Sequence, residues 1–312
     1  MTLAANFVRG CDALTEWRDD VLSGTPPTLY PVGDGVLSGI EIGPGMVTLL
    51  GGAPGAGKTA FVMQCLFDAL RLTEDLRAVV CNIEMPQGVL LDRQLARLSG
   101  VNLTDIRHRK LTAEHTDRIE AALEVIDSVV DRLTFVRPPF SLDNVAATAD
   151  IVGCDLLVLD YIQRIRPPGE HGDRRGAVDA TMNHLRAFAD AGLAVVVLSA
   201  IGRTKDARGR SSYSGDGLSL ASFRESSELE FGADDAFILT PDEETEGCVA
   251  LRHLKSRNGQ CQNIALKFDA ALQRFGADFD WLDVIQQDNC AKTALRDAWG
   301  PARSRDGAGG AA

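Results

Sequence analysis

The stretch that decides the fold is MVTLLGGAPGAGKTAFVMQCLFDALRL, residues 46–72. A short apolar segment, Met46–Gly51, runs into the motif GAPGAGKT at residues 52–59, and an amphipathic pattern covers Lys58–Leu72. The motif has the form G-x-x-x-x-G-K-[ST] and lies between a predicted strand and a predicted helix, which is the context that a phosphate-binding loop requires. In such a loop, glycines turn backbone N–H groups inward around phosphate oxygens, and the N-terminus of the following helix adds its positive dipole end.

These eight residues predict a site for a nucleoside triphosphate. Lys58 is expected to reach the β- and γ-phosphates, and the Thr59 hydroxyl is expected to hold Mg²⁺. The alternative is a Gly-rich turn that matches the pattern by chance, and it is disfavoured because both the motif and its context agree. The predicted binding residues are Gly52, Ala53, Pro54, Gly55, Ala56, Gly57, Lys58 and Thr59.

Strand and helix patterns alternate along the chain around this loop. The apolar runs Leu156–Tyr161 and Leu193–Ser199 are continuous, as in the strands of a parallel sheet that is buried on both faces. From Gly247 to Phe275, short strands follow one another with turn signals such as Asn258-Gly259, which predicts antiparallel hairpins added at one edge. The sequence therefore predicts an α/β fold: a mostly parallel central sheet flanked by helices, with antiparallel hairpins near the C-terminus.

Composition divides the chain into four parts. Residues 1–24 are predicted to form a linker-like helix, and residues 25–45 a linker rich in Gly and Pro. Residues 46–285 are predicted to form the nucleotide-binding domain, and residues 286–312 a tail that is partly disordered. The helices expected in the domain are Lys58–Leu72, Gln87–Ser99, Thr112–Val130, Ser141–Ile151, Ala177–Ala191 and Ser222–Phe231.

The overall composition excludes several classes of protein. Of 312 residues, 45% are hydrophobic and 24% are charged, which argues against a disordered chain. No apolar run is long enough to cross a membrane, and the first residues lack the pattern of a secretion signal. Seven scattered cysteines without a C-x-x-C pair argue against a disulfide framework or a zinc site, and they fit a cytoplasmic protein. The net charge of -12 argues against coating nucleic acid with the whole surface, but it allows a local basic channel.

Two acidic residues stand at the C-terminal ends of predicted strands. Asp160 ends the run Leu156–Leu159, where P-loop NTPases place the aspartate on the Mg²⁺ side; the alternative is a turn or cap residue. Glu84 ends the run Val79–Ile83, and we expect it to lie next to the strand that carries the phosphate loop. A carboxylate there could orient and deprotonate the attacking water, and the alternative is a strand-end charge in solvent.

Lys255-Ser256-Arg257 supplies two cations at the end of a predicted strand, directly before the turn Asn258-Gly259. Alternation places both long side chains on one face of the strand. They could reach the γ-phosphate of a neighbouring subunit, and an arginine supplied in this way is worth roughly 10³–10⁵ in rate. The alternative is a charged edge strand that resists aggregation.

Two polar stretches that follow core strands are candidates for contact with nucleic acid. Residues 164–175 and residues 203–210 each carry more Arg and Lys than Asp and Glu. Because few aromatic residues accompany them, contact with the phosphate backbone is favoured over base stacking, and the alternative is a pair of solvated loops. The candidate DNA-binding residues are Arg164, Arg166, Arg174, Arg175, Arg203, Lys205, Arg208 and Arg210.

The order of five short motifs resembles the C-terminal motor domain of DnaB-type replicative helicases, which are RecA-like hexameric helicases. The resemblance covers about residues 25–280, and the motifs are specific in combination rather than singly. They are Gly52–Thr59, Asn82-Ile83-Glu84-Met85-Pro86, Leu159-Asp160-Tyr161-Ile162-Gln163, Phe223-Arg224-Glu225-Ser226 and Lys255-Ser256-Arg257-Asn258-Gly259.

The resemblance implies a RecA-like P-loop NTPase fold and a homo-hexameric ring that hydrolyses ATP, with Mg²⁺, at its subunit interfaces. It also implies movement along single-stranded DNA in replication, with a primase or a loader as a partner and no membrane partner. By the same resemblance Glu84 is the catalytic glutamate and Asp160 is the Mg²⁺-side aspartate. Lys58 is also predicted to be a catalytic residue. Lys255 and Arg257 correspond to the cations that act on the neighbour's nucleotide. The basic stretches fall where the family's DNA-binding loops lie, and residues 1–24 correspond to the linker helix that docks on the adjacent subunit.

The sequence departs from the family's pattern at two points. Only about 25 residues precede the linker-like segment, where the family has a helical N-terminal domain on which primase docks. Ala200 stands where the family usually has a glutamine that senses the γ-phosphate, and a methyl group forms no hydrogen bond. These departures leave an alternative open: a non-unwinding RecA-like ATPase that acts as a nucleotide-switched loader or as a recombination mediator.

Overall fold

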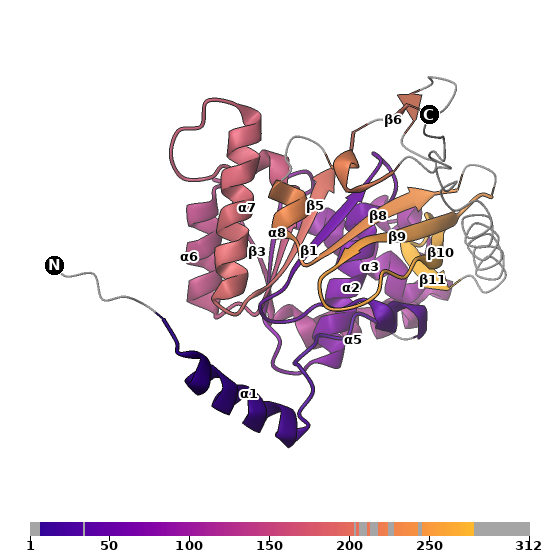
Figure 1. Ribbon diagram of the computed structural model, residues 1–312. Coiled ribbons are helices and arrows are strands. Elements are labelled where there is room, and N and C mark those ends of the chain that lie inside the picture. Colours follow the sequence, from indigo (N-terminus) through magenta and orange to yellow (C-terminus); the bar gives the residue numbers. More distant parts are fainter. Residues whose placement is uncertain are drawn as a thin grey trace, which may run out of the picture.

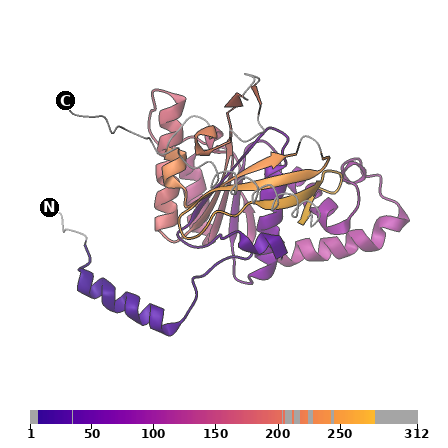
Figure 2. The same ribbon diagram turned by 45° about the vertical axis from the view of Figure 1, so that its right-hand side comes forward.

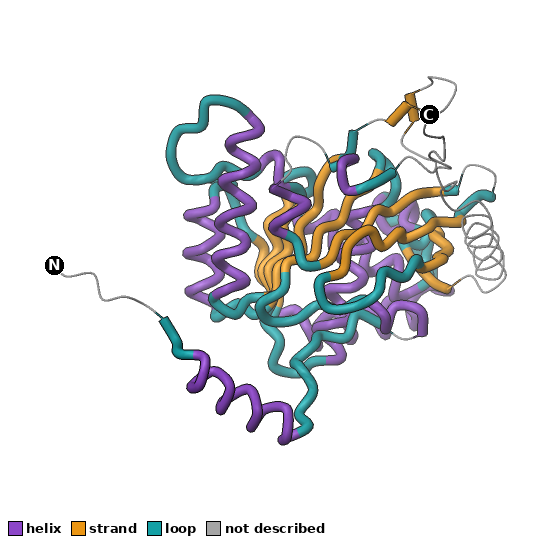
Figure 3. Tube along the Cα trace, in the orientation of Figure 1, coloured by secondary structure: helices purple, strands orange, loops and turns teal. Residues whose placement is uncertain are grey.

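Within the described part of the chain, nine strands form one mixed sheet with helices on both faces (Figures 1 and 3). This computed structural model describes residues 7–33, 35–202, 204–205, 211–212, 218–223, 228–242 and 245–277. The strand order across the sheet is β11-β10-β9-β8-β1-β5-β4-β2-β3. The six strands from β8 to β3 pair in parallel, whereas β9, β10 and β11 pair antiparallel at one edge. The predicted α/β fold with antiparallel C-terminal strands is therefore confirmed.

The strands at the centre of the sheet are buried along their whole length. Every residue of β1, β2 and β4 is buried, which is why these strands have continuous apolar sequences rather than alternating ones. The strands of the main sheet are β1 (Val47–Gly52), β2 (Ala78–Asn82), β3 (Leu133–Phe135), β4 (Leu156–Asp160), β5 (Ala194–Ala200), β8 (Asp235–Pro241), β9 (Cys248–Ser256), β10 (Ile264–Asp269) and β11 (Arg274–Ala277). A separate antiparallel pair consists of β6 (Thr204–Lys205) and β7 (Ser211–Ser212).

The helices follow the predicted pattern with several differences; one is that the helix predicted over Thr112–Val130 begins at Thr116, after a 3₁₀ turn at Ala113–His115. The helices are α1 (Gly10–Ser23), α2 (Lys58–Leu72), α3 (Gln87–Ser99), α4 (Leu103–Arg107), α5 (Thr116–Val130), α6 (Leu142–Val152), α7 (Arg174–Asp190) and α8 (Glu228–Gly232). The pattern did not predict α4, because five residues are too few to show a period. Helix α7 begins three residues earlier than predicted, because the Asp173 carboxylate accepts the Gly176 N–H at 2.7 Å and caps the helix.

The predicted helix Ser222–Phe231 was wrong at its start. Residues Leu220–Ser222 form a 3₁₀ turn, and Phe223 is buried and forms an isolated bridge with Ile201. Helix α8 therefore accounts only for the end of the predicted element. The segment 224–227 lies outside the described residues, as does the predicted tail 286–312.

Helices cover both faces of the sheet (Figures 1 and 2), and each face has its own apolar core. On one face, Leu50 of β1 packs with the buried side chains of α2, α3 and α5. On the other face, Val47 and Leu49 pack with those of α6, α7 and α8. Because successive side chains of β1 point to opposite faces of the sheet, the strand contributes to both cores. Packing on both faces fixes the strand whose C-terminal end leads into the phosphate loop.

The segment before β1 is packed rather than extended into solvent. Tyr30, Val32, Leu37, Ile40 and Ile42 are all buried, and they belong to the core that covers α2. The Gly and Pro content predicted a linker, but these apolar side chains pack the segment onto the domain. The boundary at residue 45 stays a prediction.

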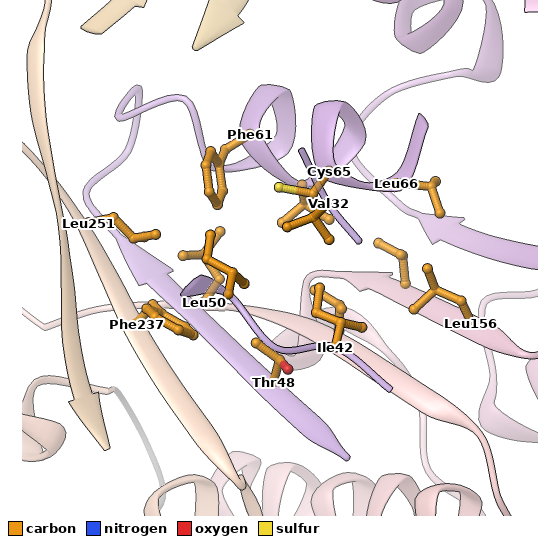
Figure 4. Close-up of a pocket in the computed structure, with 14 residues that line it drawn as sticks. Val32, Ile42, Thr48, Leu50, Phe61, Cys65, Leu66, Leu156, Phe237 and Leu251 are labelled. Carbon is orange, nitrogen blue, oxygen red and sulfur yellow. The ribbon is translucent and has the colours of Figure 1, made fainter. Parts of the chain in front are cut away.

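A small cavity lies between this segment, β1 and α2 (Figure 4). Its volume is about 30 Å³, and apolar side chains such as Val32 and Phe61 dominate its wall. Thr48 contributes a hydroxyl that is buried without a hydrogen-bond partner. The cavity is thus a packing defect beside β1 with one unsatisfied polar group.

Helix α1 stands apart from the rest of the domain (Figures 1 and 2). Leu14, Trp17 and Val21 are more than half exposed, and their spacing places them on one stripe of the helix. No helix in the described ranges is long and apolar enough to cross a membrane.

Candidate active site

The phosphate loop lies between β1 and α2, as predicted. Gly55 and Gly57 have φ angles of 80° and 88°, a region that residues with a Cβ rarely adopt. A Cβ at Gly57 would lie 2.9 Å from the Phe275 ring, so the close approach also requires glycine. The backbone of the loop is therefore shaped to leave an open cradle at the N-terminus of α2.

Three polar side chains meet at the start of α2. The Lys58 ammonium donates to the carbonyl oxygens of Gly52 and Ala53, at 2.8 and 2.9 Å. The Thr59 hydroxyl donates to the Asp160 carboxylate at 2.6 Å, so the end of β4 lies directly beside the loop. Sequence reasoning placed these residues in one site, and the structure brings them together.

Burial alters the acid–base behaviour of this group. Burial lowers the pKa of Lys58, and the negative charges of Asp160 and Glu84 oppose that shift. Burial raises the pKa of Asp160, and the hydrogen bond from Thr59 opposes that shift. Both pKa shifts arise because the charged forms of Lys58 and Asp160 have lost part of their hydration. A charged ligand in contact with them would replace that lost stabilisation.

The donor set fits the expected Mg²⁺ ion. Thr59 and Asp160 offer a hydroxyl and a carboxylate oxygen side by side, and this ion prefers oxygen ligands. Among the described residues, no group of three His, Cys, Asp or Glu side chains could hold a metal ion. A single carboxylate with a hydroxyl still suits Mg²⁺, because substrate phosphates and water commonly complete its coordination.

Glu84 lies on the loop that follows β2, and Asn82 holds this loop in place. The prediction that Glu84 lies next to the phosphate-loop strand was wrong, because β5 and β4 lie between β1 and β2. The Asn82 side-chain oxygen accepts the backbone N–H groups of Glu84 and Met85 at 3.0 and 2.8 Å. Its amide group donates to the Asp160 carboxylate at 2.8 Å. One buried amide therefore ties the Glu84 loop to the Asp160 strand, a link that the sequence motif did not reveal.

A cleft of about 500 Å³ lies at the C-terminal end of β1 and contains the predicted catalytic groups Lys58 and Glu84. Lys58, Thr59, Glu84 and Asp160 all line it, together with Ala200 at the end of β5. Next to Ala200, the Gln163 amide oxygen accepts the Ala200 N–H at 3.3 Å. The cleft thus gathers residues from four adjacent parallel strands at their C-terminal ends, where open α/β sheets bind ligands.

Further lining residues were missed at the sequence level, among them Phe268, Gln273 and Arg93. Phe268 and Gln273 come from β10 and the β10–β11 turn, which the sequence could not place beside the loop. Arg93 of α3 also lines the cleft, and its Nε atom is buried without a hydrogen-bond partner. Burial lowers the pKa of Arg93, and the charge of Asp160 opposes that shift. Its spacing of three residues from the buried Leu90 was a signal that it faces inward.

Lys255 and Arg257 lie at the opposite end of β1. The register pairs Thr48, near the start of β1, with Asp235 of β8, and Asp235 pairs with Ser256 of β9. The Lys255 ammonium donates to the Glu230 carbonyl at 2.6 Å, and burial lowers its pKa. The Arg257 guanidinium pairs with Asp234 at 2.6 Å. The structure therefore separates these two cations from the cleft of their own chain.

The predicted DNA-binding residues are only partly described. Arg164 and Arg166 are exposed beyond the end of β4, and the Arg164 guanidinium donates to the Tyr161 hydroxyl at 3.1 Å. Arg174 and Arg175 are exposed in the first turn of α7 rather than in a loop. Lys205 lies in β6, whereas Arg203, Arg208 and Arg210 lie outside the described residues.

The family model described as DnaB-like helicase C-terminal domain matches residues 27–277. The chain belongs to this family. Replicative DNA helicase DnaB of Buchnera aphidicola subsp. Schizaphis graminum is 27% identical over 254 residues, which are 76% of this chain and 52% of that protein. A probable plasmid replicative DNA helicase of Chlamydia trachomatis is 23% identical over 245 residues, 77% of this chain and 52% of that protein. This member of the DnaB-like family thus spans about half the length of these relatives.

Solved structures show the same fold. One of them, described as an ATPase domain, has a TM-score of 0.75 and 20% identity, and the match covers 88% of this chain and 100% of that one. Another, described as a DnaB-like replicative helicase and its interactions with primase, has a TM-score of 0.74 and 18% identity, over 89% of this chain and 68% of that one. The family and the names of its members favour a helicase motor over the loader and mediator alternatives.

Proposed function

We propose that this chain is the ATP-driven motor of a ring-forming, DnaB-like DNA helicase that moves along single-stranded DNA in replication. The observation that carries the proposal is the placement of two complementary half-sites at opposite ends of β1. One end presents a phosphate cleft, and the other end presents Lys255 and Arg257. Copies that stack head to tail would join the two halves.

The distance between the half-sites requires a second copy. A strand rises about 3.3 Å per residue, so the six residues of β1 separate its ends by about 17 Å. An arginine side chain cannot span that distance to the cleft of its own chain. Arg257 can therefore act on a nucleotide only if another copy binds that nucleotide, and head-to-tail contacts of this kind close into rings.

Each of the cleft residues would have its own role in ATP hydrolysis. The Lys58 ammonium would leave its two loop carbonyls and contact the β- and γ-phosphates, while the loop N–H groups hold the phosphate oxygens. Glu84 would orient the attacking water and accept its proton. Thr59 and Asp160 would hold Mg²⁺, which, when bound, neutralises charge between the phosphates. Arg93 adds a second cation from the same chain.

The same arrangement supports the proposed DNA path and assembly. Arg164 and Arg166 are exposed beyond the C-terminal end of β4, on the edge of the sheet that also holds the cleft. Backbone phosphates of single-stranded DNA are a ligand that suits these exposed arginines. The exposed stripe of Leu14, Trp17 and Val21 on α1 would pack on the adjacent copy of a hexamer. A primase or a loader is a proposed partner.

The test is ATP turnover by the full chain with and without oligo-dT, followed by strand displacement on a forked duplex. The proposal expects turnover that single-stranded DNA stimulates, and a stimulation that weakens steeply as salt rises because phosphate contacts release counterions. Lys58→Ala is expected to remove turnover, whereas Arg71→Ala, an exposed site on the same helix, is the matched control. Absence of ATP turnover under all conditions would refute the motor. Turnover without strand displacement would point to the loader alternative.

A further inference from the structure

The buried carboxylate of Asp234 joins three parts of the chain at the start of β1. Its Oδ2 atom accepts the Val47 backbone N–H at 2.8 Å and the Arg186 guanidinium at 2.6 Å. Its Oδ1 atom pairs with the Arg257 guanidinium at 2.6 Å. The side chain of Asp234 is only 5% exposed, so these contacts replace nearly all of its solvation.

The two arginines at this carboxylate are held differently. Arg186 is anchored inside the chain, because it also donates to the Gly45 carbonyl and to the Asp190 carboxylate. Arg257 is 50% exposed, and its further anchor is its backbone N–H, which donates to the Asp234 carbonyl at 3.0 Å. Asp234 therefore holds Arg257 through both main chain and side chain, while half of the Arg257 side chain remains open to the surface.

We propose that Asp234 is a positioning residue that fixes the Arg257 guanidinium, at the outer surface, in the orientation needed to reach a nucleotide bound by the adjacent copy. The inference rests on the proposed function, since it assumes that Arg257 acts on a neighbour. An arginine side chain has many rotamers, and a buried carboxylate that holds one of them removes the ordering cost from the reaction step. Val47 and Arg186 fix the carboxylate itself, because they occupy its other oxygen.

A purely structural role for Asp234 gives a different expectation. The carboxylate connects α7, β1 and β8, so its loss could weaken every copy in which it occurs. Positioning, in contrast, matters only in the copy that supplies Arg257. The two roles are therefore separated by asking in which copy of a shared site the substitution acts.

The experiment uses mixtures of two inactive full-length variants. A donor copy, Lys58→Ala, cannot use its own loop but keeps Arg257, and an acceptor copy, Arg257→Ala, keeps its loop. Turnover that returns on mixing comes from donor–acceptor interfaces. Asp234→Asn is then added to the donor alone or to the acceptor alone, and kcat and KM for ATP are measured with single-stranded DNA present.

Positioning predicts that Asp234→Asn in the donor lowers the recovered kcat by about tenfold or more, because a small displacement of a catalytic cation has large effects. The same change in the acceptor is expected to alter it by less than about twofold, and Asp190→Asn in the donor is the matched control at the other partner of Arg186. Equal losses in donor and acceptor, or no loss in the donor, would overturn the inference alone. Failure of the parent variants to recover turnover would overturn the shared site and the inference with it. If melting shows that Asp234→Asn does not fold, Asp234→Glu keeps the charge, moves the carboxylate, and must show the same donor-only loss.

Discussion

The two ends of β1 differ in how a cation is held there. At the C-terminal end, Lys58 is bound to two carbonyls of its own loop, so its hydrogen-bond partners come from one continuous stretch of sequence. At the N-terminal end, Arg257 is bound by Asp234, and that carboxylate is itself held by α7 and by β1. At the C-terminal end, Lys58 can leave its carbonyls to contact a nucleotide that its own chain binds. At the N-terminal end, Arg257 is fixed where only a nucleotide bound by another copy can be within its reach.

The comparison teaches why the phosphate loop can be read from one local motif, whereas the carboxylate that holds Arg257 cannot. A phosphate loop needs consecutive backbone N–H groups, so its residues must be adjacent in sequence. A positioned guanidinium needs only a carboxylate within reach, and the fold can bring that carboxylate from any element. Asp234 and Arg186 lie 48 residues apart, yet they meet at 2.6 Å.

Removal of the Arg257 side chain is the strongest test of the proposal that the two ends of β1 serve different copies. Arg257→Ala is expected to lower ATP turnover of the assembled protein by roughly 10³–10⁵, because the charge that develops at the γ-phosphate loses its partner from the neighbour. Nucleotide binding by separate copies should be unchanged, since the cleft is about 17 Å away by the rise of about 3.3 Å per residue along β1. Phosphate release and equilibrium nucleotide binding are the measurements.

The control for that prediction is Lys110→Ala, an exposed cation in the turn after α4. Full turnover by the assembled Arg257→Ala variant would break the comparison, because the N-terminal end of β1 would then have no part in hydrolysis. A large loss with Lys110→Ala would show that the effect reflects overall charge rather than position.

Substitution of Glu84 separates binding from chemistry within the cleft. Glu84→Gln is expected to lower kcat by about 10²–10⁴, because an amide does not accept the proton of the attacking water. Binding of a fluorescent ATP analogue should stay close to that of the unchanged chain, since the loop and Lys58 remain. Glu74→Gln, at an exposed site after α2, is the matched control. Equal losses in binding and turnover would show that Glu84 holds the ligand rather than the water.

Much of the fold and of the cleft could be predicted because each signal was local. The bounds of α2 were read from the motif and the apolar stripe, and Asp160 was read from a continuous apolar strand. The family match over residues 27–277 agrees with the motif order. The roles of the individual site residues stay predictions, even though the structure places Lys58, Glu84 and Asp160 in one cleft.

The remainder depended on contacts that sequence spacing does not encode. Nothing in the sequence placed Phe268 and Gln273 beside the phosphate loop, because the antiparallel strands reach it only through the folded sheet. The buried positions between Tyr30 and Ile42 were hidden by the Gly and Pro residues around them. Composition describes a segment as a whole, whereas burial is decided residue by residue.

Substitution of Gly57 tests whether the end of the phosphate loop tolerates a side chain. Gly57→Ala is expected to weaken nucleotide binding about tenfold and to destabilise the fold by roughly 1–3 kcal/mol, because φ is 88° there and the new methyl group would lie 2.9 Å from Phe275. Gly88→Ala is the matched control, since a Cβ in α3 meets nothing within 4 Å and should stabilise the helix by about 0.5–1 kcal/mol. Urea unfolding and nucleotide titration measure both. Equal behaviour of the two variants would show that the loop tolerates a side chain.

The cavity beside β1 should affect stability without affecting chemistry, and Thr48 tests this. Its hydroxyl is buried without a partner beside the cavity of about 30 Å³, so Thr48→Val keeps the shape and removes an unsatisfied group. The expected gain is about 1 kcal/mol in the free energy of urea unfolding, with ATP turnover unchanged. Thr134→Val is the control, because Thr134 is a half-buried strand residue whose hydroxyl is not among the buried unpartnered atoms. A change in turnover with Thr48→Val would mean that the two ends of β1 communicate through the packing between them. An unchanged rate would mean that the strand acts as a rigid spacer, which separates the cation that each copy supplies from the nucleotide that it binds.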